Sequence, residues 1–117
     1  MRVLLVEDDL LIALDAEFMM TDAGHVVVGT AMTEDEAVEL ALRERPDVLV
    51  LDLRLARGGC GRRVAERVRE HWDVPVIFAS GNLDPVTRER LAPLGPVAMI
   101  GKPYLKTQLV GALGEVA

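Results

Sequence analysis

VLLVEDD, residues 3–9, places four apolar residues directly before three acidic ones. Three later segments have the same form, an apolar run that ends on a polar residue: VLVLD (48–52), VIFAS (76–80) and AMIGK (98–102). Strands of a parallel sheet that are buried on both faces are near-continuous runs of Val, Ile and Leu, and ligands gather at the carboxyl ends of such strands. The four segments therefore predict one parallel sheet with a polar site at one edge.

The side chains at these strand ends suit a metal and a phosphoryl group. Glu7, Asp8 and Asp52 would place several carboxylates side by side, and the oxygen ligands and repulsion of such a cluster suit Mg²⁺. The hydroxyl of Ser80 and the ammonium of Lys102 are groups that can hold the oxygens of a phosphoryl group. We therefore expect Mg²⁺ and a phosphoryl group carried on one of the carboxylates.

Size and composition indicate one soluble globular domain over residues 1–117. The chain has a mass of 12.8 kDa, with 50% hydrophobic and 27% charged residues and no low-complexity tract. Its net charge of −6 argues against direct binding to nucleic acid, which requires a basic face, and favours protein partners.

Several absences in the sequence point to the cytoplasm. The apolar runs are too short to span a membrane, and the acidic residues close to Met1 leave no room for a signal peptide. Cys60 is the single cysteine and cannot form an internal disulfide, which fits a reducing compartment. We expect a cytoplasmic protein with no membrane association.

Five strands and five helices are expected to alternate along the chain. The strands are predicted at residues 2–6, 25–30, 48–51, 74–79 and 97–100. The helices are predicted at about 10–23, 33–45, 62–72 and 85–92, with a last one whose inner face carries Leu105, Leu109, Leu113 and Val116. Right-handed crossovers would make this an α/β fold, a doubly wound five-stranded parallel sheet with helices on both faces.

Local signals support the helix boundaries. In the first helix Leu11, Leu14, Phe18 and Met19 recur at helical spacing, and Gly24 follows as a C-terminal cap. Thr33 with Glu36 forms a capping-box pattern at the second helix. Pro85 suits the first turn of the fourth.

Taken in order, the segments VEDD, LVLDL, FASG and GKP resemble a known family. Over its whole length the chain is similar to the receiver domain of bacterial two-component response regulators, and particularly to the single-domain α-proteobacterial type with a "FATG"-like end of the fourth strand. That end is here Phe78-Ala79-Ser80-Gly81. The resemblance implies a flavodoxin-like fold with strand order 2-1-3-4-5.

The resemblance also assigns roles in phosphoryl transfer. It implies that Asp52 is the phosphoacceptor, taking a phosphoryl group from a histidine kinase or a histidine phosphotransfer protein. Ser80 and Lys102 would each hold a phosphoryl oxygen, and the Lys102–Pro103 peptide bond would be cis. A downstream protein target is implied, and a homodimer is left open.

The same resemblance implies a metal site. Asp8, Asp52 and the backbone carbonyl of Arg54 would bind Mg²⁺ directly, while Glu7 would act through a metal-bound water. Asp9 is expected to serve mainly as the N-cap of the first helix.

Three departures from the family pattern concern the output surface. Met99 stands where most receivers have Tyr or Phe, the loop after Asp52 is one residue longer before Gly61, and Pro93 and Pro96 flank a turn. Met fills irregular gaps through several rotamers, so we expect the response to be carried by residues 81–85 and the short helix after them.

Other functional classes fit less well. A phosphatase of the haloacid dehalogenase type needs an Asp-x-Asp motif after its first strand, where this chain has Glu7, and dinucleotide binding needs a glycine-rich turn there. We expect no enzymatic activity beyond assistance to the chain's own phosphorylation and dephosphorylation. The remaining alternative is a receiver-like protein-interaction module that works without phosphorylation.

Overall fold

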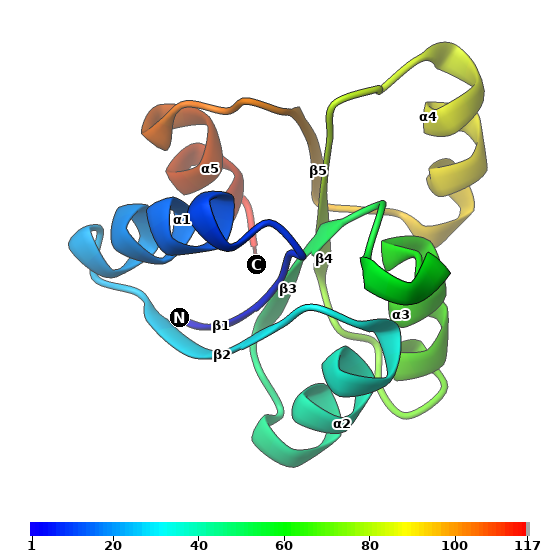
Figure 1. Cartoon of the computed structure of the whole chain (residues 1–117), viewed down its shortest axis with the longest axis horizontal. Coiled ribbons are helices and arrows are strands. Elements are labelled where there is room, and N and C mark those ends of the chain that lie inside the picture. The colour runs from blue at the N-terminus through cyan, green and yellow to red at the C-terminus, as the bar shows by residue number, and fades with distance from the viewer. Residues whose placement is uncertain (117) are drawn as a thin grey trace.

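Five parallel strands form one sheet in the order β2-β1-β3-β4-β5 in the computed structural model, which describes residues 1–116 (Figure 1). The strands are β1 (Arg2–Val6), β2 (Val26–Ala31), β3 (Val48–Asp52), β4 (Val76–Ser80) and β5 (Ala98–Gly101). The helices are α1 (Leu10–Asp22), α2 (Glu34–Glu44), α3 (Gly61–Arg69), α4 (Pro85–Leu91) and α5 (Lys106–Leu113). The predicted flavodoxin-like fold and its strand order are confirmed.

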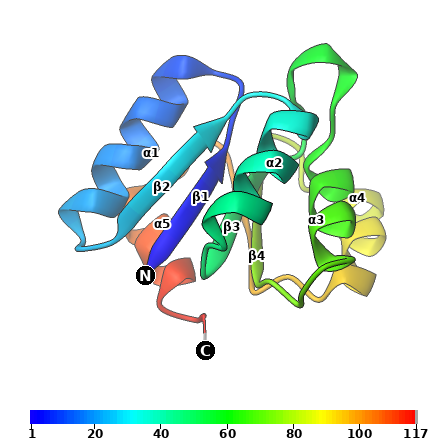
Figure 2. The same cartoon turned by 90° about the horizontal axis from the view of Figure 1, so that it is seen from below.

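The core has two layers, one on each face of the sheet. Helices α1 and α5 cover one face, and α2, α3 and α4 cover the other, as Figures 1 and 2 show. Alternate residues of each strand enter opposite layers: in β1, Val3 and Leu5 pack with α1 and α5, whereas Leu4 and Val6 pack with the other helices. Burial on both faces explains why the strands are continuous apolar runs.

Helix α1 turns several of its large apolar side chains to solvent. Ala13 and Ala16 are buried against the sheet, whereas Leu11, Leu14 and Phe18 are 78%, 54% and 68% exposed. The spacing of these residues correctly predicted a helix, but periodicity does not tell which apolar face meets the sheet. Here the face with Ala13, Ala16 and Met20 does. In α5, Leu109 and Leu113 are buried as predicted, but Leu105 precedes the helix and is exposed, so its assignment to the inner face was wrong.

The predicted capping residues lie at the helix ends. The Asp9 carboxylate accepts hydrogen bonds from the N–H groups of Leu11 and Ile12 at 3.0 and 3.2 Å, which confirms it as the N-cap of α1. Thr33 caps α2 by accepting from the N–H of Glu36, but the Glu36 side chain accepts from the N–H of Met32 rather than completing the capping box at Thr33.

Some boundaries differ from the expected ones by a few residues. Helix α3 ends at Arg69 instead of near Trp72, and the Trp72 ring instead lies under the guanidinium of Arg45 at 4.4 Å. Among the described residues, no helix has the length and apolar character needed to cross a bilayer.

Register along the sheet brings the ends of four strands to one edge. Val6 pairs with Leu51, Asp52 with Ala79, and Ser80 with Gly101. The residues that end these strands or directly follow them therefore meet at the carboxyl edge.

Candidate functional site

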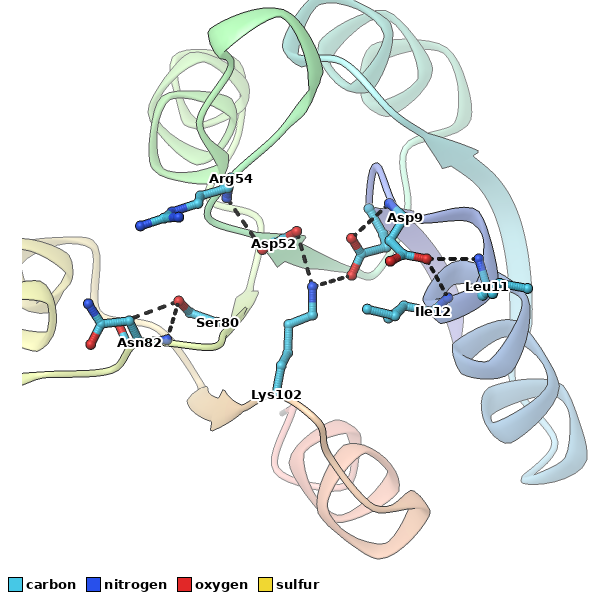
Figure 3. Close-up of polar contacts among 9 residues, drawn as sticks. Asp9, Leu11, Ile12, Asp52, Arg54, Ser80, Asn82 and Lys102 are labelled. Atoms are coloured by element: carbon cyan, nitrogen blue, oxygen red, sulfur yellow. Dashed lines mark hydrogen bonds and ion pairs between the residues drawn. The ribbon is translucent and has the colours of Figure 1, made fainter.

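Lys102 links two of the predicted acidic residues at this edge (Figure 3). Its Nζ lies 2.7 Å from Oε1 of Glu7 and 3.2 Å from Oδ2 of Asp52. All three side chains are largely withdrawn from solvent, Glu7 being only 3% exposed. The contact with Glu7, the shorter of the two, was not predicted from the sequence.

Burial and neighbouring charges shift the pKa values of Glu7 and Lys102. Burial raises the pKa of Glu7 to about 7, with the neighbouring Asp52 adding to the effect and the hydrogen bond from Lys102 opposing it. Burial lowers the pKa of Lys102, but its hydrogen bond to Glu7 and the charge of Asp52 outweigh that effect and raise it. Lys102 is therefore a permanent cation in the site.

Three carboxylates come together beside this cation. Glu7, Asp8 and Asp52 each offer an oxygen, and these oxygens all lie within 4.8 Å of one another. Two of the residues are buried and Asp8 is half-buried. A compact set of oxygen donors at the rim of the sheet fits a hard divalent cation such as Mg²⁺.

Arg54 and Asp52 are held together by the backbone. The N–H of Arg54 donates to Oδ1 of Asp52 at 3.3 Å, while its guanidinium points away from that carboxylate (Figure 3). The Lys102–Pro103 peptide bond is cis, as the resemblance implied.

Ser80 is turned toward its own loop. Its Oγ accepts from the N–H of Asn82 at 3.1 Å and lies 3.4 Å from the carbonyl of Asn82, to which it donates (Figure 3). A cavity of about 400 Å³ opens between Ser80 and Asp52, lined by Asp52, Arg54, Ser80, Gly81, Asn82 and Lys102. Ser80 and Lys102 thus flank the space beside Asp52. Asn82 was not identified as a site residue from the sequence. Its position two residues after Ser80 was the only feature that could have indicated it.

The loop after Asp52 is fastened to α2. Glu34 accepts hydrogen bonds from the N–H of Cys60 and from Arg63 at 3.3 and 3.0 Å, and Arg63 also donates to the carbonyl of Gly58. These contacts lower the pKa of Glu34, although its partial burial acts in the opposite direction. The longer loop is therefore an ordered segment.

An apolar surface adjoins the site on the side of α1. Leu10, Leu11, Leu14 and Phe18 are all more than half exposed. A second cavity of about 300 Å³ lies between this helix and the start of the β5–α5 connection, lined by Ile12, Asp15, Lys102, Pro103 and Tyr104. Tyr104 is partly buried and packs against the core layer that contains α1 and α5.

The chain matches one family of known proteins. The family model for the response regulator receiver domain matches residues 3–114. The phyllosphere-induced regulator PhyR of Methylorubrum extorquens is 36% identical over 116 residues, which cover 97% of this chain and 42% of PhyR.

Solved structures with the same fold belong to proteins of this kind. The receiver domain of a modulated diguanylate cyclase from Desulfovibrio desulfuricans has a TM-score of 0.89 and 28% identity, covering 98% of this chain and 91% of that one. PhyR from Brucella abortus has a TM-score of 0.85 and 31% identity, covering 98% of this chain and 46% of its own. The chain thus spans less than half of either PhyR protein.

Proposed function

We propose that this chain, which belongs to the response regulator receiver domain family of two-component signalling, accepts a phosphoryl group on Asp52 from a phosphohistidine of a histidine kinase or histidine phosphotransfer protein. The observation that carries the proposal is the contact of Lys102 with Asp52 at the wall of a cavity that Ser80 also lines. Asp52 is the carboxylate shared by this cavity and the acidic cluster.

The transfer forms a bond between a carboxylate oxygen of Asp52 and phosphorus while the phosphorus–nitrogen bond of the donor breaks. The donor imidazole keeps the electron pair of that bond. Lys102 holds one oxygen of the arriving group, and Ser80 holds another after leaving its bonds to Asn82. Such a reaction needs positioning and charge neutralisation more than covalent help.

The metal assignment belongs to the same proposal. Asp8, Asp52 and the Arg54 carbonyl would hold Mg²⁺, with Glu7 reaching it through a water. Bound there, the ion would neutralise charge on the carboxylates and on the phosphoryl oxygens. Lys102, which contacts both Glu7 and Asp52, is placed to exchange its contact with Glu7 for one with a phosphoryl oxygen.

The exposed face of α1 is the proposed docking surface for the donor. Helix α1 begins immediately after the acidic residues at the mouth of the site, so a donor helix lying on Leu14 and Phe18 would bring its histidine toward Asp52. Burial of those side chains against an apolar partner face would stabilise the complex.

The output surface is proposed to be the loop of residues 81–85 together with α4. Ser80 is fastened to that loop through Asn82, so its departure releases the loop. Met99 is half-buried against the core layer that contains Phe78 and Leu91, and it can adapt to a small shift without a discrete change of position.

Incubation with acetyl phosphate and Mg²⁺ followed by intact-mass measurement tests the proposal. The parent should gain the mass of one phosphoryl group, and chelation of Mg²⁺ should prevent the gain. Asp52→Asn should gain nothing. A parent that stays unmodified under conditions that phosphorylate a known receiver would favour the alternative, an interaction module that works without phosphorylation.

A further inference from the structure

The charge of this acidic chain changes sign along its length. Eight of the 13 basic residues but only five of the 19 acidic ones lie between positions 54 and 90. That segment therefore has a net charge of +3, although the whole chain has −6. It contains α3 and α4, which lie next to each other in both views of the fold (Figures 1 and 2).

Part of this positive charge is only weakly paired within the described residues. Arg63 and Arg67 face α2 and are neutralised by Glu34 and Asp35. By contrast, Arg62 has only an exposed contact of 3.6 Å with Glu66 on its own helix, and such pairs are weak. Arg90 of α4 forms no ion pair within 4.0 Å with any residue from 1 to 116. The pKa of Asp84 is lowered chiefly by the hydrogen bond from the N–H of Thr87, and the charge of Arg90 adds only a weaker effect.

Arg62 and Arg90 stand on the two sides of a small groove between α3 and α4. Leu53 and Leu91, both largely withdrawn from solvent, contribute its apolar part, and Cys60 and Thr87 complete the lining. The groove has a volume of about 160 Å³. A dry cavity of roughly 150 Å³ is known to hold a benzene ring, so this one is large enough for one bulky apolar side chain.

The groove lies at the end of β3, next to the cavity that Asp52 and Ser80 line. Leu53 lines the groove, whereas its neighbours in sequence, Asp52 and Arg54, line the other cavity. Thr87 and Leu91 of α4 form the opposite wall, just beyond the loop that follows Ser80.

We propose that this groove binds an acidic segment of a partner protein, with one bulky apolar side chain held between Leu53 and Leu91 and flanking carboxylates facing Arg62 and Arg90. Charge complementarity selects the acidic partner, and the apolar part of the groove selects a side chain rather than a phosphate. A long nucleic acid would be repelled by the acidic remainder of the chain. The groove exists in the resting fold, so this binding goes beyond the proposed phosphorylation and does not depend on it.

Fluorescence anisotropy with the unphosphorylated chain and a short fluorescein-labelled peptide, one phenylalanine flanked on both sides by glutamates, tests the proposal. Replacing the glutamates by glutamines, or the phenylalanine by alanine, should weaken binding by about tenfold or more. Arg62→Glu/Arg90→Glu should abolish it. Arg43→Glu/Lys106→Glu, which makes the same change in net charge on α2 and α5, should bind as the parent does.

Two further measurements guard against a false positive. Thr87→Trp fills the groove without changing charge, so it should prevent binding while circular dichroism shows an intact fold. Amide shifts on titration with the peptide should centre on Leu53, Cys60 and Thr87. Absence of binding, unchanged binding by the charge-reversed groove variant, shifts centred on α1, or tighter binding of a single-stranded DNA of equal charge would each overturn the proposal. Because no phosphodonor is present, these failures leave the function of Asp52 untouched.

Discussion

Gly61, the first residue of α3, lies directly against the backbone carbonyl of Asp52. A β-carbon at position 61 would overlap that carbonyl oxygen and would also crowd the side chain of Leu51. The N–H of Gly61 in turn donates to the carbonyl of Leu53 at 3.3 Å. The start of α3 therefore positions the backbone of the proposed phosphoacceptor and of the residue that follows it.

Gly61→Ala should destabilise the fold and slow phosphorylation. The new methyl group must displace backbone rather than a flexible side chain, and overpacking of this kind costs about 1–3 kcal/mol. Urea unfolding measures the first effect and intact mass over time with acetyl phosphate the second.

Gly111→Ala is the matched control. Gly111 lies inside α5 with open space around its would-be β-carbon, so alanine there should stabilise the helix by about 0.5–1 kcal/mol. A Gly61→Ala protein as stable and as quickly phosphorylated as the parent would refute the role given to this glycine.

Beryllofluoride, a phosphoryl mimic, should change amide hydrogen exchange at residues 81–92 more than in β5 around Met99. Ser80 must leave its bonds to Asn82 to reach the mimic, whereas Met99 adapts in place. Lys102→Ala should largely remove the change at residues 81–92 while leaving the chain folded. The proposed output surface is wrong if β5 alone responds, and the role of Lys102 is wrong if its variant responds like the parent.

Phe18→Glu should slow phosphorylation by a phosphohistidine protein by about tenfold or more, because it places a charge in the proposed apolar contact. Phe18 is 68% exposed, so the fold should be little affected. Phosphorylation by acetyl phosphate, which needs no docking surface, should proceed at the parent rate. Equal slowing with both donors would show damage to the site rather than loss of docking.

Tyr104 should ionise well above its ordinary range. Burial, assisted by the negative charge of Glu7, raises its pKa from 10.0 to about 12. The neutral phenol is thus favoured in the folded state, so its contribution to stability is present below pH 10 and is lost as the pH rises toward 12. It is the only tyrosine, so ultraviolet titration reports it directly, with circular dichroism to confirm folding. A midpoint near 10 in the folded chain would contradict the burial of its hydroxyl.

The apolar runs were sufficient to predict a parallel sheet, and the polar residues that follow or end four of them were sufficient to predict the edge that carries the site. The strand order was implied by the resemblance to receiver domains and not by the pattern of the strands. Asp52, Ser80 and Lys102 were predicted as one site because parallel strands must end together. Their chemical roles stay predictions, since geometry alone does not show transfer.

Other features depended on packing that periodicity does not encode. In α1 the face with Ala13, Ala16 and Met20 meets the sheet, whereas Leu11, Leu14 and Phe18, whose spacing predicted the helix, are exposed. The contact of Lys102 with Glu7 joins residues that are 95 positions apart in the sequence, so no local pattern predicts it. The contact of Gly61 with Asp52 is made by the backbone, and the residue types alone do not indicate it.

Locating the phosphoryl group tests the central claim most directly. An aspartyl phosphate is an acyl phosphate, which borohydride reduces to homoserine, so peptide mass spectrometry after reduction identifies the modified carboxylate. Treatment of the chain with acetyl phosphate and Mg²⁺ followed by reduction should yield homoserine at position 52 alone. Homoserine at Glu7's neighbours Asp8 or Asp9 with an unaltered Asp52 would contradict the account.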